Sequence, residues 1–112
     1  MPTASDRRLK KNITALSDVH SGLFDRLSPV EYEFINGEGR LHYGLVAQDV
    51  ISAMTELGID EHALDLVHHD YDVSPGTGEL NDAYAIAYQN LIPMLIHEVQ
   101  KLKHKIKTLE GE

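Results

Sequence analysis

Residues 90–109 read NLIPMLIHEVQKLKHKIKTL, the most regular apolar pattern in the chain. Spacings of three and four residues alternate between the members of what we term the apolar seam: Ile92, Leu95, Val99, Leu102, Ile106 and Leu109. This spacing places all six side chains on one helical face, with branched residues at heptad position a and leucine at d. Pro93 falls in the first turn, where its missing N–H costs little. The pattern predicts a coiled-coil helix about 30 Å long at 1.5 Å per residue.

Charged residues beside the apolar seam favour association with other copies of the chain. In a parallel assembly each g residue faces the next e residue of a neighbour. Glu98 would then face Lys103, and Lys105 would face Glu110, so both pairs are opposite in sign. The alternative is that the seam packs on its own domain. Branched a residues with leucine at d are typical of dimers in model peptides, so the seam alone does not indicate three strands.

The rest of the chain predicts short helices and strands. Apolar spacings of three and four residues are typical of a helix, and strict alternation is typical of a strand. The expected elements are a helix at 15–27 that Pro29 stops, a hairpin of strands at 30–34 and 41–45 around a turn at 36–39, a short helix ending before Gly58, a strand at 63–67, a loop at 70–80 and a strand at 84–88. The fold class is therefore α+β, mainly helical, with small antiparallel strands and the long C-terminal helix.

Composition and charge exclude several classes of protein. The 112 residues predict one domain, and without cysteine the chain has no disulfide framework. No apolar run approaches the roughly 20 residues that span a bilayer, so no membrane association is expected. The net charge of −8 divides into +3 for residues 1–17, which we term the N-terminal arm, −12 for residues 18–84 and +1 for residues 85–112. A body this acidic argues against nucleic acid as a partner.

A serine and a lysine in the N-terminal arm suggest nucleophilic chemistry. Ser5 precedes Lys10 by five residues in a basic run, and neighbouring cations favour the neutral form of a lysine, which can take a proton from a serine hydroxyl. Five extended residues span roughly 16 Å, and on a helix they are about 140° apart. A turn, or a lysine from another chain, must close this gap. The alternative is a serine beside a solvated basic run.

Four motifs in order resemble a known family. They are SDRRLKKNI at 5–13, LFDRLSPVEYEF at 23–34, HYGLVAQDV at 42–50 and AYAIAYQNLIPMLIHEVQKLKHKIKTLE at 83–110. Together they resemble the endosialidase-type intramolecular chaperone domain at the C-terminus of phage tailspikes, tail fibres and neck appendages. The resemblance implies a homotrimer that helps an upstream β-rich stalk of the same polypeptide to fold. It also implies that the domain then cuts itself off.

The resemblance assigns roles to individual residues. Ser5 matches the nucleophile of the family and Lys10 the lysine of its dyad, so cleavage is expected between Ala4 and Ser5, with an ester intermediate that water hydrolyses. Asp6, Arg8, His42 and Gly44 are expected as neighbours of the site, and Gly44 should also allow a close approach of backbones. Residues 1–4 would be a stalk remnant, 5–89 the globular chaperone domain and 90–112 the trimerising helix. The isolated chain is expected to cut slowly or not at all.

The same resemblance implies a virion precursor that is assembled in the host cytoplasm and releases this domain on maturation. The loop at 70–80 is either a surface loop or an arm that grips the stalk. No cofactor and no metal are expected, because the side chains of His68, His69 and Asp70 are adjacent in sequence and should diverge. Two alternatives remain: a trimerisation or adaptor module that is never cut, and a hydrolase that acts on other chains.

Overall fold

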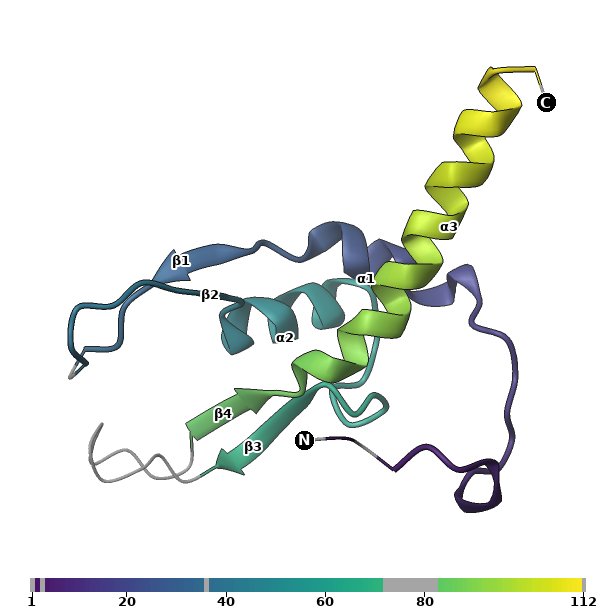
Figure 1. Cartoon of the computed structure of the whole chain (residues 1–112). Helices are drawn as coiled ribbons and strands as arrows, with labels where there is room; N and C mark the ends of the chain where they lie inside the picture. The colour runs from purple at the N-terminus through teal and green to yellow at the C-terminus, as the bar shows by residue number, and fades with distance from the viewer. Residues whose placement is uncertain (1, 3, 36, 72–82, 112) are drawn as a thin grey trace.

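The computed structural model describes residues 2, 4–35, 37–71 and 83–111 (Figure 1). The elements in order are η1 (Arg7–Leu9), η2 (Asp18–His20), α1 (Ser21–Arg26), β1 (Val30–Tyr32), β2 (His42–Gly44), α2 (Ala47–Glu56), β3 (Val67–Tyr71), β4 (Ala83–Ile86), η3 (Tyr88–Asn90) and α3 (Leu91–Leu109). This confirms the expected α+β class with a long C-terminal helix. Most of the loop expected at 70–80 lies outside the described residues.

Two separate two-stranded antiparallel sheets account for the strands. In the first, β1 pairs with β2, which confirms the predicted hairpin. In the second, β3 pairs with β4, with an irregularity between His68 and Tyr71. The strand predicted at 63–67 was wrong, because β3 begins only at Val67. The preceding residues form a turn instead, in which Ala63 N–H donates to the Asp60 carbonyl at 2.9 Å.

The core lies where α1 and α2 pack over the second sheet. Its fully buried members are Leu23, Val50, Ala53, Met54 and Leu66. Three of the five come from α2, where spacings of three and one put them on one face of the helix. The predicted end of this helix is confirmed, and Gly58 adopts a φ of +72° there. Hydrogen bonds from the N–H groups of residues 58 and 59 to the carbonyls of residues 55 and 54 complete a Schellman cap.

The helix predicted at 15–27 is shorter than the pattern suggested. Every residue from 11 to 18 is exposed, and regular structure begins with η2 at Asp18. Of the apolar residues that suggested the helix, Leu23 is completely buried, whereas Leu16 is 46% exposed. Helix formation is costly to nucleate and depends on packing of an apolar face. The helix therefore starts where burial starts, and the arm before it stays extended.

Gly44 lets a tyrosine side chain approach β2. A Cβ atom on Gly44 would lie 2.5 Å from the Tyr88 hydroxyl. That hydroxyl accepts a hydrogen bond from Leu45 N–H at 2.9 Å and lies 3.3 Å from the Leu45 carbonyl. The close approach expected at Gly44 therefore involves a side chain rather than a second backbone. It ties the first sheet to η3, at the base of α3.

The molecule is extended because two segments leave the body. In Figure 1, α3 runs from the body into solvent toward the C-terminus, and the N-terminal arm runs outside the body from η1 to η2. The radius of gyration is 17.2 Å, whereas a compact chain of this length has one of about 13 Å. In the described part of the chain, no helix has the length and apolar character needed to cross a membrane.

Met54→Ala should lower the free energy of unfolding by about 2–5 kcal/mol, because it leaves a cavity at a fully buried position. Thr55→Ala is the matched control, since the next residue of α2 is exposed and its loss should change stability by no more than about 0.5 kcal/mol. Urea unfolding followed by circular dichroism measures both. Equal effects of the two substitutions would contradict the position of the core.

Candidate active site

A capped turn at η1 organises the start of the N-terminal arm. The Asp6 Oδ1 atom accepts a hydrogen bond from the Arg8 backbone N–H at 2.9 Å. The same carboxylate accepts from the Arg8 guanidinium, at 3.1 Å from Nε and 2.8 Å from Nη2. Arg8 thereby lowers the pKa of Asp6 below its usual value, chiefly through the side-chain hydrogen bond. One ion pair thus both caps the turn and keeps Asp6 charged.

The turn brings the predicted serine and lysine into contact. Leu9 N–H donates to the Asp6 carbonyl at 3.0 Å, and Lys10 N–H donates to the Arg7 carbonyl at 3.1 Å. Lys10 Nζ consequently reaches back and donates to Ser5 Oγ at 2.9 Å. The five-residue gap that the sequence left open is closed within one chain. Sequence reasoning found both residues but not the turn that joins them.

The Ser5–Lys10 pair is open to solvent. Every described residue of the N-terminal arm is exposed, including both members of the pair. Two expected neighbours, Asp6 and Arg8, lie in the same turn as the pair. The other two, His42 and Gly44, lie on β2, on the opposite side of the molecule from the arm (Figure 1). Within one chain they do not join the pair.

His42 has a packing partner of its own in the hairpin. Its ring stacks on Tyr32, with centroids 5.4 Å apart, and meets the edge of Phe34 at 4.9 Å. These contacts run across β1 and β2 and stabilise a hairpin that otherwise buries little. The aromatic cluster explains His42 without a catalytic role inside one copy.

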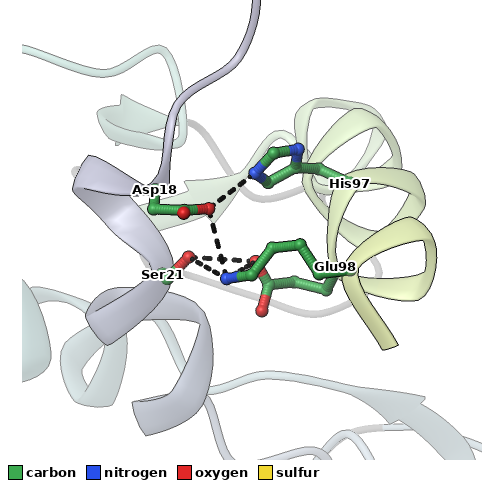
Figure 2. A network of polar contacts seen from close by, with 5 residues as sticks. Asp18, Ser21, His97 and Glu98 are labelled. Carbon is green, nitrogen blue, oxygen red and sulfur yellow. Dashed lines mark hydrogen bonds and ion pairs between the residues drawn. The ribbon is translucent and has the colours of Figure 1, made fainter. Parts of the chain in front are cut away.

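A second serine–lysine pair links α1 to α3, and the sequence gave no warning of it. We term it the Lys101 cluster, and its members are Asp18, Ser21, His97, Glu98 and Lys101 (Figure 2). Lys101 Nζ lies 3.2 Å from Asp18 Oδ1 and 3.4 Å from Glu98 Oε2, and it donates to Ser21 Oγ at 3.1 Å. Ser21 Oγ donates to Glu98 Oε2 at 3.0 Å. His97 Nε2 lies 2.8 Å from Asp18 Oδ1.

The electrostatics of the Lys101 cluster favour a structural role. The hydrogen bond to Asp18 raises the pKa of Lys101 above its usual value. In turn His97, and then Lys101, lower the pKa of Asp18. Lys101 is therefore an ammonium ion at neutral pH and cannot act as a base toward Ser21. A signal was present in the sequence, because His97 and Lys101 are four residues apart on the helical face opposite the apolar seam.

Ligand atoms for a metal come together here rather than at the expected histidines. Among the described residues, the ligand atoms of Asp18, His97 and Glu98 all lie within 4.8 Å of one another. The Lys101 ammonium already supplies the positive charge for these groups. Of the residues weighed in the sequence, His68 Nε2 lies 2.7 Å from Asp65 Oδ1, and the His69 ring stacks on Tyr84 with centroids 4.3 Å apart.

The apolar seam of α3 faces away from the body of its own chain. Its members range from 45% exposed at Val99 to 86% at Leu109. The opposite, polar face carries the Lys101 cluster and contacts η2 and α1. One predicted detail changes, because Glu98 bonds within its own chain and its side chain is only 18% exposed. The charge pair of Glu98 with Lys103 of a neighbour is therefore not available in this conformation, whereas Lys105 and Glu110 are exposed.

An apolar groove continues the apolar seam toward the base of α3. Its volume is about 420 Å³. It is lined by Phe24, Leu27, Pro29, Tyr43, Gly44, Leu45, Tyr88, Leu91, Ile92 and Leu95. Two of these residues belong to the seam, so groove and seam form one apolar surface.

Comparisons with known proteins agree with this arrangement. Residues 5–59 match the family model Peptidase_S74, described as the chaperone of endosialidase, and this segment contains the whole Ser5–Lys10 turn. A solved structure described as a novel intramolecular chaperone is similar over 93% of this chain and 99% of its own, with a TM-score of 0.66 and 21% identity. The chain is similar to the endosialidase-chaperone family in sequence over residues 5–59 and in fold over nearly its whole length.

A second solved structure places this fold in a longer protein. It is the carboxy-terminal domain of the bacteriophage T5 L-shaped tail fibre with its intramolecular chaperone domain. The similarity covers 100% of this chain but 32% of that one, with a TM-score of 0.69 and 19% identity. No curated protein sequence matches the chain. The endosialidase-chaperone fold is thus shared with a domain that occupies about a third of a larger fibre chain.

Asp18→Asn should destabilise this domain in a pH-dependent way, because it removes the carboxylate that His97 and Lys101 bind. The folded pKa of Asp18 is below its ordinary 3.8, so its contribution is full above about that pH and is lost as pH falls through the lower folded value. The loss in urea midpoint should therefore be largest at neutral pH and shrink below about pH 4.

Asp25→Asn makes the same change of charge at an exposed position of α1 and is the matched control. Urea titrations of the wild type and both variants from neutral to acidic pH measure the difference. A midpoint difference for Asp18→Asn that stays constant over this range would contradict the role of the carboxylate.

Proposed function

We propose that this chain assembles as a homotrimer, assists folding of an upstream β-rich stalk of the same polypeptide, and then releases itself by cutting between Ala4 and Ser5. The observation that carries the cleavage step is the 2.9 Å contact of Lys10 Nζ with Ser5 Oγ. It lies within the segment that matches the family model. The proposal gives the chain a single turnover on its own backbone.

The proposed reaction is an acyl shift followed by hydrolysis. Lys10 takes the proton of the Ser5 hydroxyl while Oγ attacks the carbonyl carbon of Ala4. The bond between the Ala4 carbonyl carbon and the Ser5 nitrogen breaks, and Lys10 returns the proton to the leaving amine. The Ala4 carbonyl is now an ester on Ser5. Water hydrolyses this ester, which yields a carboxylate at Ala4 and restores the Ser5 hydroxyl.

The open position of the Ser5–Lys10 pair indicates that the site is completed by other segments. The negative oxygen formed on the Ala4 carbonyl needs hydrogen-bond donors in a water-poor site. The described part of the arm is exposed and supplies the serine and the lysine without an enclosing wall. We assign the missing wall to a neighbouring copy or to the folded stalk. This dependence would delay cleavage until the stalk has assembled.

Exposed apolar surface supports the assembly step. The chain has an accessible surface of 9188 Å², whereas a compact monomer of 12.5 kDa has about 6,200 Å². Ile96, at heptad position e, is also 52% exposed and widens the apolar seam at the end nearest the apolar groove. A seam wider than positions a and d suits more than two helices. The number three itself comes from the resemblance to the family.

A removable trimerising domain solves a problem of folding kinetics. Three long β-rich chains must find a common register, which involves many non-local contacts and exposes strand edges meanwhile. Association through α3 would raise the local concentration of the stalk chains and align their ends. Cleavage afterwards would remove this low-energy route and leave the stalk kinetically trapped as a folded trimer.

The tail-fibre neighbour supports a place in a virus particle. We propose that the chain is synthesised as part of a virion precursor, assembles in the host cytoplasm, and is absent from the mature fibre. A second candidate function is a permanent trimerisation or adaptor module. The exposure of the Ser5–Lys10 pair favours this alternative, and the following experiment separates the two.

Intact mass spectrometry of the chain preceded by its stalk tests the cleavage directly. The wild type should separate at the bond between Ala4 and Ser5, and Ser5→Ala and Lys10→Ala should each slow this at least about a hundredfold. Lys11→Ala removes the adjacent, exposed lysine and should cut like the wild type. An uncut wild type would overturn self-cleavage and leave the adaptor function.

Substitutions on the two faces of α3 test the assembly role. Leu102→Asp places a charge in the apolar seam, where each buried leucine contributes about 1.5–3 kcal/mol, so the yield of soluble, folded stalk should fall at least about tenfold. His104→Asp introduces the same side chain at an exposed position outside the seam and should leave the yield near that of the wild type. Equal yields from both variants would exclude the seam as the surface that assists folding.

A further inference from the structure

The Asp6 carboxylate stands beside two cations but is bound by one of them. Arg8 supplies its hydrogen bonds, through the backbone N–H at 2.9 Å, Nε at 3.1 and 3.3 Å and Nη2 at 2.8 Å. Lys10 turns the other way, and its Nζ donates to Ser5 Oγ. The acidic residue nearest to the dyad therefore leaves the lysine alone.

The Lys101 cluster shows the opposite arrangement in the same chain. There the lysine of a serine–lysine pair lies 3.2 Å from Asp18 and 3.4 Å from Glu98. These carboxylates hold Lys101 as an ammonium ion and raise its pKa. A serine–lysine pair with carboxylates on the lysine is thus locked in the charged form, which cannot accept a proton from serine.

We infer that Arg8 is a positioning residue for the proposed cleavage, which binds the Asp6 carboxylate and so keeps it from pairing with Lys10. The inference rests on the proposed function. A carboxylate within about 4–6 Å of an ammonium ion favours the charged form. With Asp6 held by Arg8, Lys10 can lose its proton and accept the hydroxyl proton of Ser5.

The surroundings of Lys10 keep this arrangement local. The N-terminal arm runs outside the body (Figure 1), so within one chain the charged groups near Lys10 are those of the arm itself: Asp6, Arg7, Arg8 and Lys11. Asp6 is the single acid among them. Whether it binds Arg8 or Lys10 therefore decides whether the lysine faces a carboxylate.

The bidentate geometry explains why an arginine stands at position 8. Nε and Nη2 of a guanidinium form a fixed fork that matches the two oxygens of a carboxylate. A lysine at this position would offer a point charge on a flexible chain and would compete poorly with Lys10 for Asp6. Since Asp6 also caps η1, the capping and electrostatic roles must be separated by experiment.

The pH dependence of the cleavage rate separates these roles in the chain preceded by its stalk. Arg8→Gln frees the carboxylate, so the pH of half-maximal rate should rise by roughly one unit, and the rate below that pH should fall about tenfold. Asp6→Asn combined with Arg8→Gln removes the carboxylate but keeps a side chain that can cap η1. This double variant should return the midpoint to that of the wild type. Arg8→Lys should lie between wild type and Arg8→Gln.

Arg7→Gln is the matched control, because it removes the same charge from η1 without releasing Asp6. Its midpoint should move less than that of Arg8→Gln. If Arg8→Gln does not cut at any pH, recovery of cleavage in the double variant supports the role, and its failure overturns it. A wild type that cuts while the Arg8→Gln midpoint stays in place overturns the role of Arg8 alone. An uncut wild type overturns the cleavage itself and this role with it.

Discussion

The placement of one lysine determines which face of α3 is free. Lys101 lies between the carboxylates of Asp18 and Glu98, and His97 and Ser21 complete the contacts between α3 and the first helical turns of the body. Because these contacts occupy the polar face of the helix, the apolar seam on the other face points into solvent. A helix attached through its apolar face would have satisfied its own chain and left nothing to assemble.

The same cluster fixes the point where the N-terminal arm enters the body. Asp18 is the first residue of η2, directly after the arm, and it is bonded to the helix that carries the seam. Assembly through α3 would therefore bring three arms close to one another at a defined place. In one chain the arm already joins serine and lysine through the η1 turn, but it does not enclose them. Assembly and cleavage are thus linked by position rather than by a shared pocket.

Local patterns were predictable from sequence, and long-range contacts were not. The apolar spacing of α3, the hairpin and the glycine after α2 each depend on residues a few positions apart, and all three predictions were confirmed. The start of α1 was placed too early because periodicity alone does not show where burial begins. Glu98 was assigned to a neighbouring chain because its partner, Ser21, is 77 positions away and nothing local announces it. The serine and lysine of the candidate site were named in advance, but the turn that joins them depends on the Asp6–Arg8 pair, whose geometry a sequence does not display.

The central claim is that the exposed seam of α3 is a surface for association of three copies. The mass of the wild-type chain in solution, measured by sedimentation equilibrium over a range of concentrations, tests this most directly. The account predicts a species of three chains, each of 12.5 kDa. A mass of a single chain at every concentration would contradict it.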